Sequence, residues 1–408
     1  MKRAFKVRIY PTPSQTIFIN KTIGSCRFIY NKMLEERISF YNENKGNKEV
    51  LYSHKYKTEK EYKKEFEWLK EVDSRAIHQT KRNLETAYKR FFKNQNDFPK
   101  FHCKKAIGSY YTIRPTLIKI NFKYYKIQLP KLGWINFKDG RSKIDGKIIN
   151  ATVSRTATGK YYCSLCIETG APEKPLKPIT KAIGLDMSLS KFYVDSSGNS
   201  PDGFERWYRK NEKRIAHYQK VVSRRKLGSK NRAKAQHKVN VLNEKVSNCR
   251  NDFQQKLSKQ LVRDNDLIVL EDLNMRGMAG ALKLGKSVND LGWGKFVWQL
   301  QYKAKDQGTT IVFADKFFPS SKVCNSCGCK NTELKLSDRE WTCPNCGKYL
   351  DRDHNAALNL YYYGLNKIGA VSPEFTPVET SMHKVGSVKQ ECIQLKYCVK
   401  SPERQYME

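Results

Sequence analysis

Two matched cysteine motifs constrain the fold of this chain more than any other feature. Cys324 and Cys327 form one C-x-x-C motif, Cys343 and Cys346 form a second, and a glycine follows each motif. Each motif predicts a tight knuckle that points two sulfurs at one ion, and the hairpin between the knuckles brings them together into a tetrahedron. Two complete pairs leave no open coordination position. We therefore expect structural Zn²⁺ in a zinc ribbon, with Cys329 outside the ligand set.

A third C-x-x-C motif does not predict a metal site. Cys163 and Cys166 lie in a segment with the alternating pattern of a strand, where residues three apart point to opposite faces. The first ten residues, MKRAFKVRIY, lack the apolar core of a signal peptide, and no apolar run approaches the roughly 18 residues of a membrane span. We therefore expect reduced thiols, a cytoplasmic location and no membrane partner.

The N-terminal half predicts a β domain that is interrupted by helices. Apolar and basic residues alternate over 5–10, which is typical of a strand with one buried face. From Ser14, expected to cap a helix, apolar residues recur at helical spacing, and further helices are expected over about 59–70 and 74–92. A period of two returns between about 108 and 170. We therefore expect the first strand to join this later sheet.

Three carboxylates follow or begin predicted elements of the C-terminal half. Asp186 follows AIGL, Glu271 follows LIVL, and Asp353 lies in DRDHNAALN. Their order along the alternating strands and helices is that of an RNase H-like nuclease, where carboxylates converge on two divalent cations about 3.5–4 Å apart. Hard cations prefer such oxygen ligands. Asp272 is expected on the other side of its strand and Asp351 at the N-cap of the last helix, so neither is a candidate ligand.

The charge of the chain predicts a polyanionic partner. Lys and Arg number 77 against 40 for Asp and Glu, a formal net charge of +37 over 408 residues, which is room for several domains. Nucleic acid is the expected partner, because each neutralised phosphate releases a counterion. The segment 205–250 holds 15 Lys or Arg and 3 Glu over one or two expected long helices. We favour a phosphate-binding surface there over a merely solvated face.

The motifs together resemble the TnpB proteins of bacterial insertion sequences, relatives of the type V CRISPR effectors. The resemblance covers nearly the whole chain to about residue 365 and includes the order of the nuclease segments around the zinc ribbon. The matching stretches are KVRIYPTPSQ (6–15), CRFIYNKML (26–34), NLETAYKRFF (83–92), LPKLGWI (129–135), GLDMSL (184–189), LEDLNMRGM (270–278), GWGKFVWQLQYKA (292–304), FFPSSKVCNSCG (317–328), WTCPNCG (341–347) and DRDHNAALNL (351–360).

The resemblance implies a multidomain α/β chain with a β-barrel wedge domain, a helical recognition bundle and a RuvC-type, RNase H-like nuclease domain that contains the zinc ribbon. The expected boundaries are 1–13 for the first wedge strand, 14–105 for the helical recognition domain, 106–172 for the rest of the wedge, 173–180 for a linker, 181–318 for the first part of the nuclease, 319–350 for the zinc ribbon, 351–366 for the last nuclease helix and 367–408 for a poorly ordered tail.

The resemblance also implies an activity and its partners. A guide RNA from the transposon end pairs with one strand of double-stranded target DNA, a short adjacent motif is read by the protein, and Asp186, Glu271 and Asp353 hold catalytic Mg²⁺, for which Mn²⁺ is a substitute. A nucleoid association follows when the protein is bound to DNA. Candidate nucleic-acid contacts are Lys6 and Arg8 on the first strand and Ser74, Arg75, His78, Gln79 and Arg82 on one helix.

Two other functions account for part of the pattern. An RNA-guided DNA-binding repressor without cleavage explains the charge and the cysteines equally well, but it has no need of three intact carboxylates. An RNase H-like transposase fits the acidic residues, but it needs a module for DNA ends that the sequence does not reveal. The sequence therefore favours a metal-dependent DNA endonuclease.

Overall fold

A computed structural model defines the fold for most of the chain. The predicted tail lies outside the described part from residue 370 onward. The structure describes residues 2–104, 107–113, 115–140, 146–170, 172–281, 285–335 and 337–369.

The larger sheet has seven strands in the order β2-β6-β7-β1-β5-β4-β3, and β1 (Lys2–Tyr10) lies at its centre. Val7 and Ile9 of β1 are buried while Lys6 and Arg8 are exposed, as the alternation predicted. The strand pairs in the described part do not join β2 to β3, so closure into a barrel stays a prediction. The other strands are β2 (Gly108–Thr112), β3 (Lys119–Asn121), β4 (Lys126–Leu129), β5 (Gly133–Lys138), β6 (Lys147–Arg155) and β7 (Tyr161–Glu168), with a 3₁₀ turn at Pro115–Leu117.

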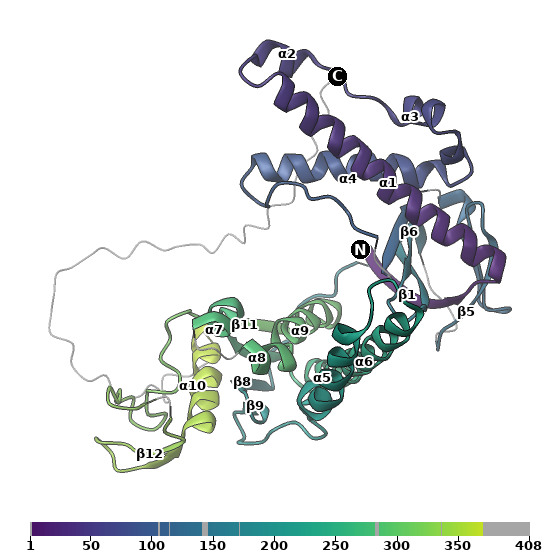
Figure 1. Ribbon diagram of the computed structural model, residues 1–408. Coiled ribbons are helices and arrows are strands. Elements are labelled where there is room, and N and C mark those ends of the chain that lie inside the picture. Colours follow the sequence, from purple (N-terminus) through teal and green to yellow (C-terminus); the bar gives the residue numbers. More distant parts are fainter. Residues whose placement is uncertain are drawn as a thin grey trace.

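The helices between β1 and β2 share their core with this sheet (Figure 1). The expected cap at Ser14 is wrong, because α1 (Pro13–Glu43) is capped by Thr12, two residues earlier. The Thr12 hydroxyl accepts from the Gln15 N–H at 3.3 Å, and the Gln15 amide oxygen accepts from the Thr12 N–H at 3.0 Å. Pro13 fits at the first helical position, where no intrahelical N–H bond is needed. The other helices here are α2 (Lys48–Ser53), α3 (Glu59–Glu65), a 3₁₀ turn (Glu67–Lys70) and α4 (Ser74–Phe92).

The C-terminal half is built on a four-stranded sheet in the order β11-β10-β8-β9. β8 and β11 both run parallel to β10, whereas β9 pairs antiparallel with β8. The strands are β8 (Ala182–Ser188), β9 (Phe192–Asp195), β10 (Leu267–Glu271) and β11 (Thr310–Ala314). The helices are α5 (Trp207–Arg224), α6 (Lys230–Asp264), α7 (Met275–Ala281), α8 (Gly285–Leu291), α9 (Trp293–Gln307) and α10 (Arg352–Lys367).

Helices cover both faces of the four-stranded sheet. α6 and α9 pack on one face through a core that includes Leu257, Phe296 and Leu270. α10 packs on the other face, where Leu360 meets Val269. None of the described helices combines the length and the apolar character that a membrane span requires.

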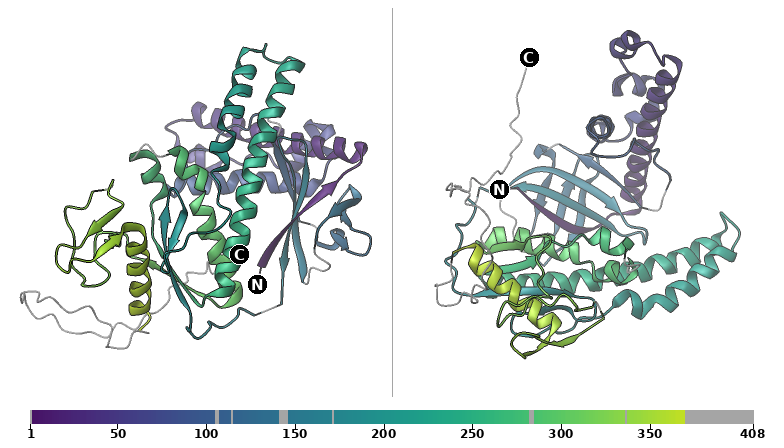
Figure 2. Two further views of the ribbon diagram at one scale, coloured as in Figure 1. Left: turned by 90° about the horizontal axis from the view of Figure 1, so that it is seen from below. Right: turned by 90° about the vertical axis from the view of Figure 1, so that its left-hand side faces the viewer.

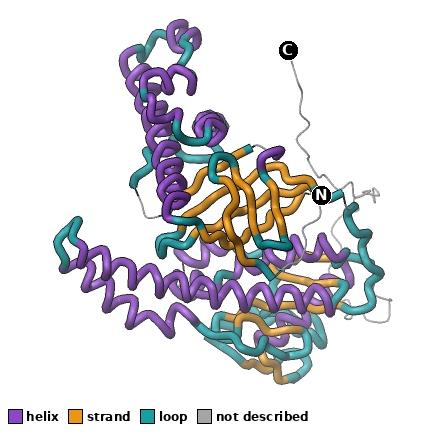
Figure 3. The backbone as a smooth tube through the Cα atoms, turned by 90° about the vertical axis from the view of Figure 1, so that its right-hand side faces the viewer, coloured by secondary structure: helices purple, strands orange, loops and turns teal. Residues whose placement is uncertain are grey.

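The helical pair α5–α6 projects beyond the sheet (teal in Figure 2). Its base joins the larger sheet, where Glu244 accepts hydrogen bonds from Thr158 Oγ1 at 2.9 Å and Lys160 Nζ at 2.8 Å. Figure 3 shows the strands of the larger sheet between this pair and the N-terminal helices. The helical pair therefore contacts both sheets: α6 packs on the four-stranded sheet, and Glu244 binds the β6–β7 turn of the larger one.

Candidate metal and carboxylate sites

Asp186 and Glu271 lie side by side because of the strand register. Leu185 of β8 pairs with Leu270 of β10 in a parallel ladder, so the next residue on each strand reaches the same edge of the sheet. The apolar residues before them are fully buried, which anchors both strands in the core. The carboxylates are thus held just beyond the last parallel pair of the two strands, toward the carboxyl edge of the sheet, where ligands of α/β sheets commonly bind.

Asp353 approaches the same place from the first turn of α10. Asp351 caps this helix, its side chain accepting from the His354 N–H at 2.8 Å. The cap leaves Asp353 free to point toward the sheet, where its Oδ1 lies 3.8 Å from Nη1 of Arg339. Asp272 is exposed and is not among the residues that line this pocket. The structure therefore brings the three predicted carboxylates into one pocket, whose lining includes neither Asp272 nor Asp351.

The three carboxylates line a pocket of about 630 Å³. Burial raises the pKa of Asp186 well above its ordinary value, and the charges of Glu271 and Asp353 raise it further. Burial also raises the pKa of Glu271, although the Ser320 hydrogen bond and the Arg352 charge oppose that rise. Burial therefore disfavours the ionised forms of Asp186 and Glu271, and for Asp186 the neighbouring carboxylates add to this effect.

The donor set of this pocket fits hard divalent cations. Three carboxylates line the pocket from two strands and a helix, and hard divalent cations prefer such oxygen ligands. The residues that would hold Mg²⁺ or Mn²⁺ are Asp186, Glu271 and Asp353.

Several pocket residues were missed by the sequence reasoning. Arg206, Arg339 and Arg352 line the pocket, and the Ser320 hydroxyl donates a hydrogen bond to Glu271 Oε1. Their roles depend on contacts with distant residues. The sequence does show serine and arginine residues in the segments next to the cysteines and Asp353. Their spacing along the chain, however, does not connect them to the carboxylates.

The four predicted zinc ligands form one cluster. Their sulfur atoms all lie within 4.8 Å of one another, with 3.7 Å between Cys324 and Cys346 and 3.5 Å between Cys327 and Cys343. A tetrahedral ion with Zn–S bonds of about 2.3 Å places its sulfurs about 3.8 Å apart. The cluster thus has the geometry of a four-thiolate metal site. It is supported by Leu334, Trp341 and Leu350 and by the hairpin of β12 (Glu340–Thr342) and β13 (Tyr349–Asp351).

Cys163 and Cys166 alternate on β7 as expected. Cys163 is fully buried, whereas Cys166 lies on the other, partly exposed face. These two thiols therefore do not face one ion.

The candidate nucleic-acid contacts lie on two surfaces. Lys6 and Arg8 are exposed on β1, with Lys6 Nζ 4.4 Å from the centre of the Tyr162 ring. On α4, Arg75 and Arg82 are exposed, and Ser74 is half-buried. Two further α4 side chains have protein partners: His78 Nδ1 lies 2.6 Å from Glu59 Oε1, and the Gln79 amide donates to Asn83 at 3.0 Å. The two arginines are therefore the freest of the α4 candidates, and nucleic-acid contact by any of the seven stays a prediction.

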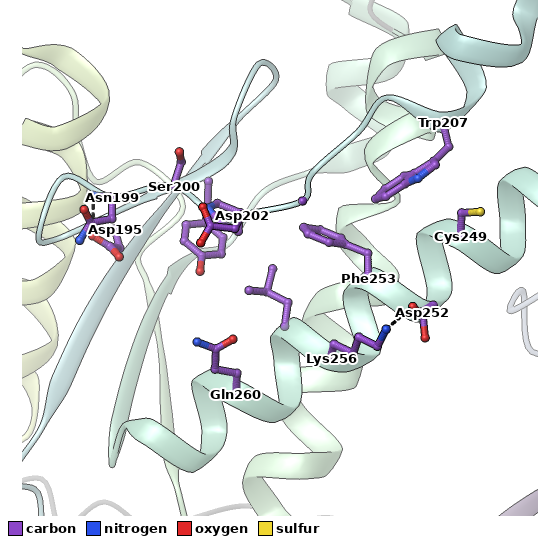
Figure 4. A pocket seen from close by; sticks show the side chains of 14 residues that line it. Asp195, Asn199, Ser200, Asp202, Trp207, Cys249, Asp252, Phe253, Lys256 and Gln260 are labelled. Atoms are coloured by element: carbon purple, nitrogen blue, oxygen red, sulfur yellow. Dashed lines mark hydrogen bonds and ion pairs between the residues drawn. The ribbon is translucent and has the colours of Figure 1, made fainter. Parts of the chain in front are cut away.

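A second pocket, of about 600 Å³, lies between the loop after β9 and α6 (Figure 4). Two of its acidic residues have partners: Asp195 accepts from the Ser197 and Asn199 N–H groups, and Asp252 forms a 2.8 Å ion pair with Lys256. Asp202 is the third acidic residue of its lining, and none of the predicted site residues lies in this pocket.

Three family models match successive parts of the chain. They are described as "Helix-turn-helix domain" over residues 1–46, "Probable transposase" over 164–282 and "Cas12f1-like, TNB domain" over 293–360. In the first of these ranges, the described residues form β1 and a single continuous helix, α1. The third range includes the four cysteines and Asp353.

The fold and the site define a compact α/β protein that carries a carboxylate pocket next to a four-cysteine module. A Cas12f1 chain solved with its single guide RNA and target DNA shares this fold with a TM-score of 0.51 and 13% identity, covering 88% of this chain and 98% of that chain. A Streptomyces pristinaespiralis protein named as an RNA-guided DNA endonuclease is 34% identical over 96% of both chains. InsQ of Escherichia coli (strain K12), named likewise, is 30% identical over 89% of this chain and 93% of its own. The chain belongs to the TnpB family.

Proposed function

We propose that this protein is an RNA-guided endonuclease that cuts double-stranded DNA by phosphodiester hydrolysis at Asp186, Glu271 and Asp353. The register of β8 and β10 carries the proposal, because it sets two carboxylates side by side, and α10 adds a third in the same pocket. The names of the full-length relatives support the guided activity and its RNA and DNA partners.

The pocket residues have different roles in the proposed hydrolysis. Two divalent cations, when bound, supply a hydroxide-like nucleophile and neutralise the leaving oxygen. Asp186, Glu271 and Asp353 fix the positions of these cations. Arg339 and Arg352 offer guanidinium groups to the phosphates of the strand that lies in the pocket.

The remaining modules fit this function. We assign the seven-stranded sheet to the wedge domain, the helices between β1 and β2 to the recognition domain, the four-stranded sheet with its helices to the RuvC-type nuclease domain, and the cysteine module to a structural Zn²⁺ ribbon. The short target-adjacent motif is then read by α4, where Arg75 and Arg82 are exposed.

Cleavage of a plasmid library tests the proposal. The protein is co-expressed with its transposon-end RNA and given plasmids with one guide-matched target beside randomised flanks, with Mg²⁺ or with EDTA. We expect guide- and Mg²⁺-dependent cuts, and a loss of more than about 100-fold in Asp186→Ala, since even outer-shell partners of metal ligands contribute about 10–100-fold. Guide-dependent binding without cuts by the unmodified protein would support the repressor instead, and joined DNA strands would support the transposase.

A further inference from the structure

The loop of residues 320–325 connects the carboxylate pocket to the four-cysteine cluster. At its start, the Ser320 hydroxyl donates a hydrogen bond to Glu271 Oε1, and near its end Cys324 contributes a sulfur to the cluster. Both residues are buried, with exposed fractions of 4% and 1%. A displacement of this short loop would therefore change the geometry of both sites.

One face of α10 holds this loop in place. The Asn359 side-chain amide donates to the backbone carbonyls of Ser320 and Val323, each at 2.7 Å. One turn earlier, the Asn355 amide donates to the Val323 carbonyl at 2.7 Å, and its oxygen accepts from the Asn325 N–H at 2.9 Å. Residues four apart share a helix face, so the two asparagines act on the loop together.

The chemistry of these contacts requires asparagine. A primary amide supplies two N–H donors, which is what Asn359 needs to satisfy two carbonyl groups at once. An aliphatic side chain would remove the Asn359 donor from the Ser320 carbonyl and leave the Val323 carbonyl with Asn355 alone, and a carboxylate would set negative charge against both. Since Asn359 is itself only 8% exposed, water is a poor substitute for its amide.

We propose that Asn359 is a positioning residue for the carboxylate pocket: by holding loop 320–325 it keeps the Ser320 hydroxyl on Glu271 and couples that carboxylate to the four-cysteine cluster. The inference rests on the proposed function, because it takes Glu271 to be a ligand of a divalent cation. Groups that orient metal ligands from the second shell affect metal affinity by about 10–100-fold.

Calorimetric titration of the full-length protein with Mn²⁺ tests the coupling. We expect the Kd for Mn²⁺ to rise about ten-fold or more in Ser320→Ala and in Asn359→Ala. Ser320→Thr keeps the hydroxyl and should retain the affinity. Asn366→Ala is the matched control, because Asn366 is an exposed asparagine at the C-terminal end of the same helix.

Amide hydrogen exchange over 320–325 gives a readout that does not depend on Mn²⁺. We expect faster exchange in Asn359→Ala and unchanged exchange in Asn366→Ala, with zinc content and thermal unfolding measured beside them. If Asn359→Ala fails to fold, the Ser320→Ala and Ser320→Thr pair decides whether the hydroxyl orients Glu271.

The outcomes separate the two proposals. Unchanged Mn²⁺ affinity in either Ser320→Ala or a folded Asn359→Ala overturns the coupling. An unmodified protein that binds no Mn²⁺ overturns the proposed nuclease site, and the positioning role with it, even where the exchange result shows that Asn359 holds the loop.

Discussion

We expect Asp186 to destabilise the metal-free protein at neutral pH. The pKa of Asp186 in the folded state lies above its ordinary value in the unfolded chain. At a pH between these two pKa values, the folded chain keeps a proton that the unfolded chain has released. Stability therefore falls as the pH rises through this window. Asp186→Asn removes the ionisable group, and we expect a higher Tm for this variant than for the unmodified protein at pH 7.5 in EDTA.

Mn²⁺ should reverse this order of stability. A ligand at 100 times its Kd stabilises the folded state by about 2.7 kcal/mol, a gain that Asp186→Asn would lose with its metal site. Thermal unfolding with EDTA and with Mn²⁺ measures both effects. Asp272→Asn, at an exposed carboxylate outside the pocket, is the control and should match the unmodified protein in both conditions. A metal-free Asp186→Asn with an unchanged or lower Tm would contradict the electrostatic argument.

The sequence predicted the residues whose placement depends on local pattern. Asp186 and Glu271 follow short apolar runs that had to be buried strands, so their position just beyond those runs could be predicted. Ser320 could not be connected to Glu271, because that contact joins residues 49 apart in the sequence and depends on how the loop packs against α10. Which side chains contact each other across elements is determined by tertiary packing, and the periodicity of apolar residues in the sequence does not predict it.

The contact between β8 and α10 requires glycine at position 184. A Cβ there would collide with the backbone of α10 at Ala357 and Tyr361. Gly184→Val must push α10 away from the sheet, and we expect destabilisation by about 1–3 kcal/mol, the usual range for overpacking. Because Asp186 and Asp353 lie on the two separated elements, Mn²⁺ affinity should fall too.

Gly294→Ala, on a different element, is the control for this substitution. Gly294 is exposed on α9 and has open space around an added Cβ, so alanine should stabilise the chain by up to about 1 kcal/mol. Chemical denaturation of both variants gives the comparison. A neutral Gly184→Val would show that the β8–α10 contact is not close in solution.

At the level of elements, the sequence predicted most helices and strands but not their contacts. The proline-free, periodic stretch after 204 gave α5 and α6, and the return of β1 to a later sheet followed from its alternating residues. The cap of α1 was misplaced because Thr12 and Ser14 are both competent cap residues, and the choice depended on the Gln15 side chain. Such choices rest on energies of about 1 kcal/mol.

At the scale of the whole molecule, the net charge of +37 includes a strongly basic segment where the α5–α6 pair projects. Arg224, Arg225 and Lys226 are exposed at the turn between these helices. We expect these residues to neutralise phosphates of the bound nucleic acid. Replacing all three by Gln should weaken binding of transposon-end RNA and reduce the slope of log K against log salt by about one for each phosphate that is no longer neutralised.

Filter binding across a salt series measures both quantities, and the control must remove the same charge from positions away from the turn between α5 and α6. Lys210, Lys256 and Lys305 are exposed, and each lies within 2.8 Å of a carboxylate oxygen, so their charges are already compensated by the protein. The triple Gln variant of these lysines changes the net charge equally and should leave the slope nearly unchanged. Equal slopes for the two triple variants would mean that nucleic acid responds to the total charge of the molecule, and that the turn between α5 and α6 does not bind the backbone directly.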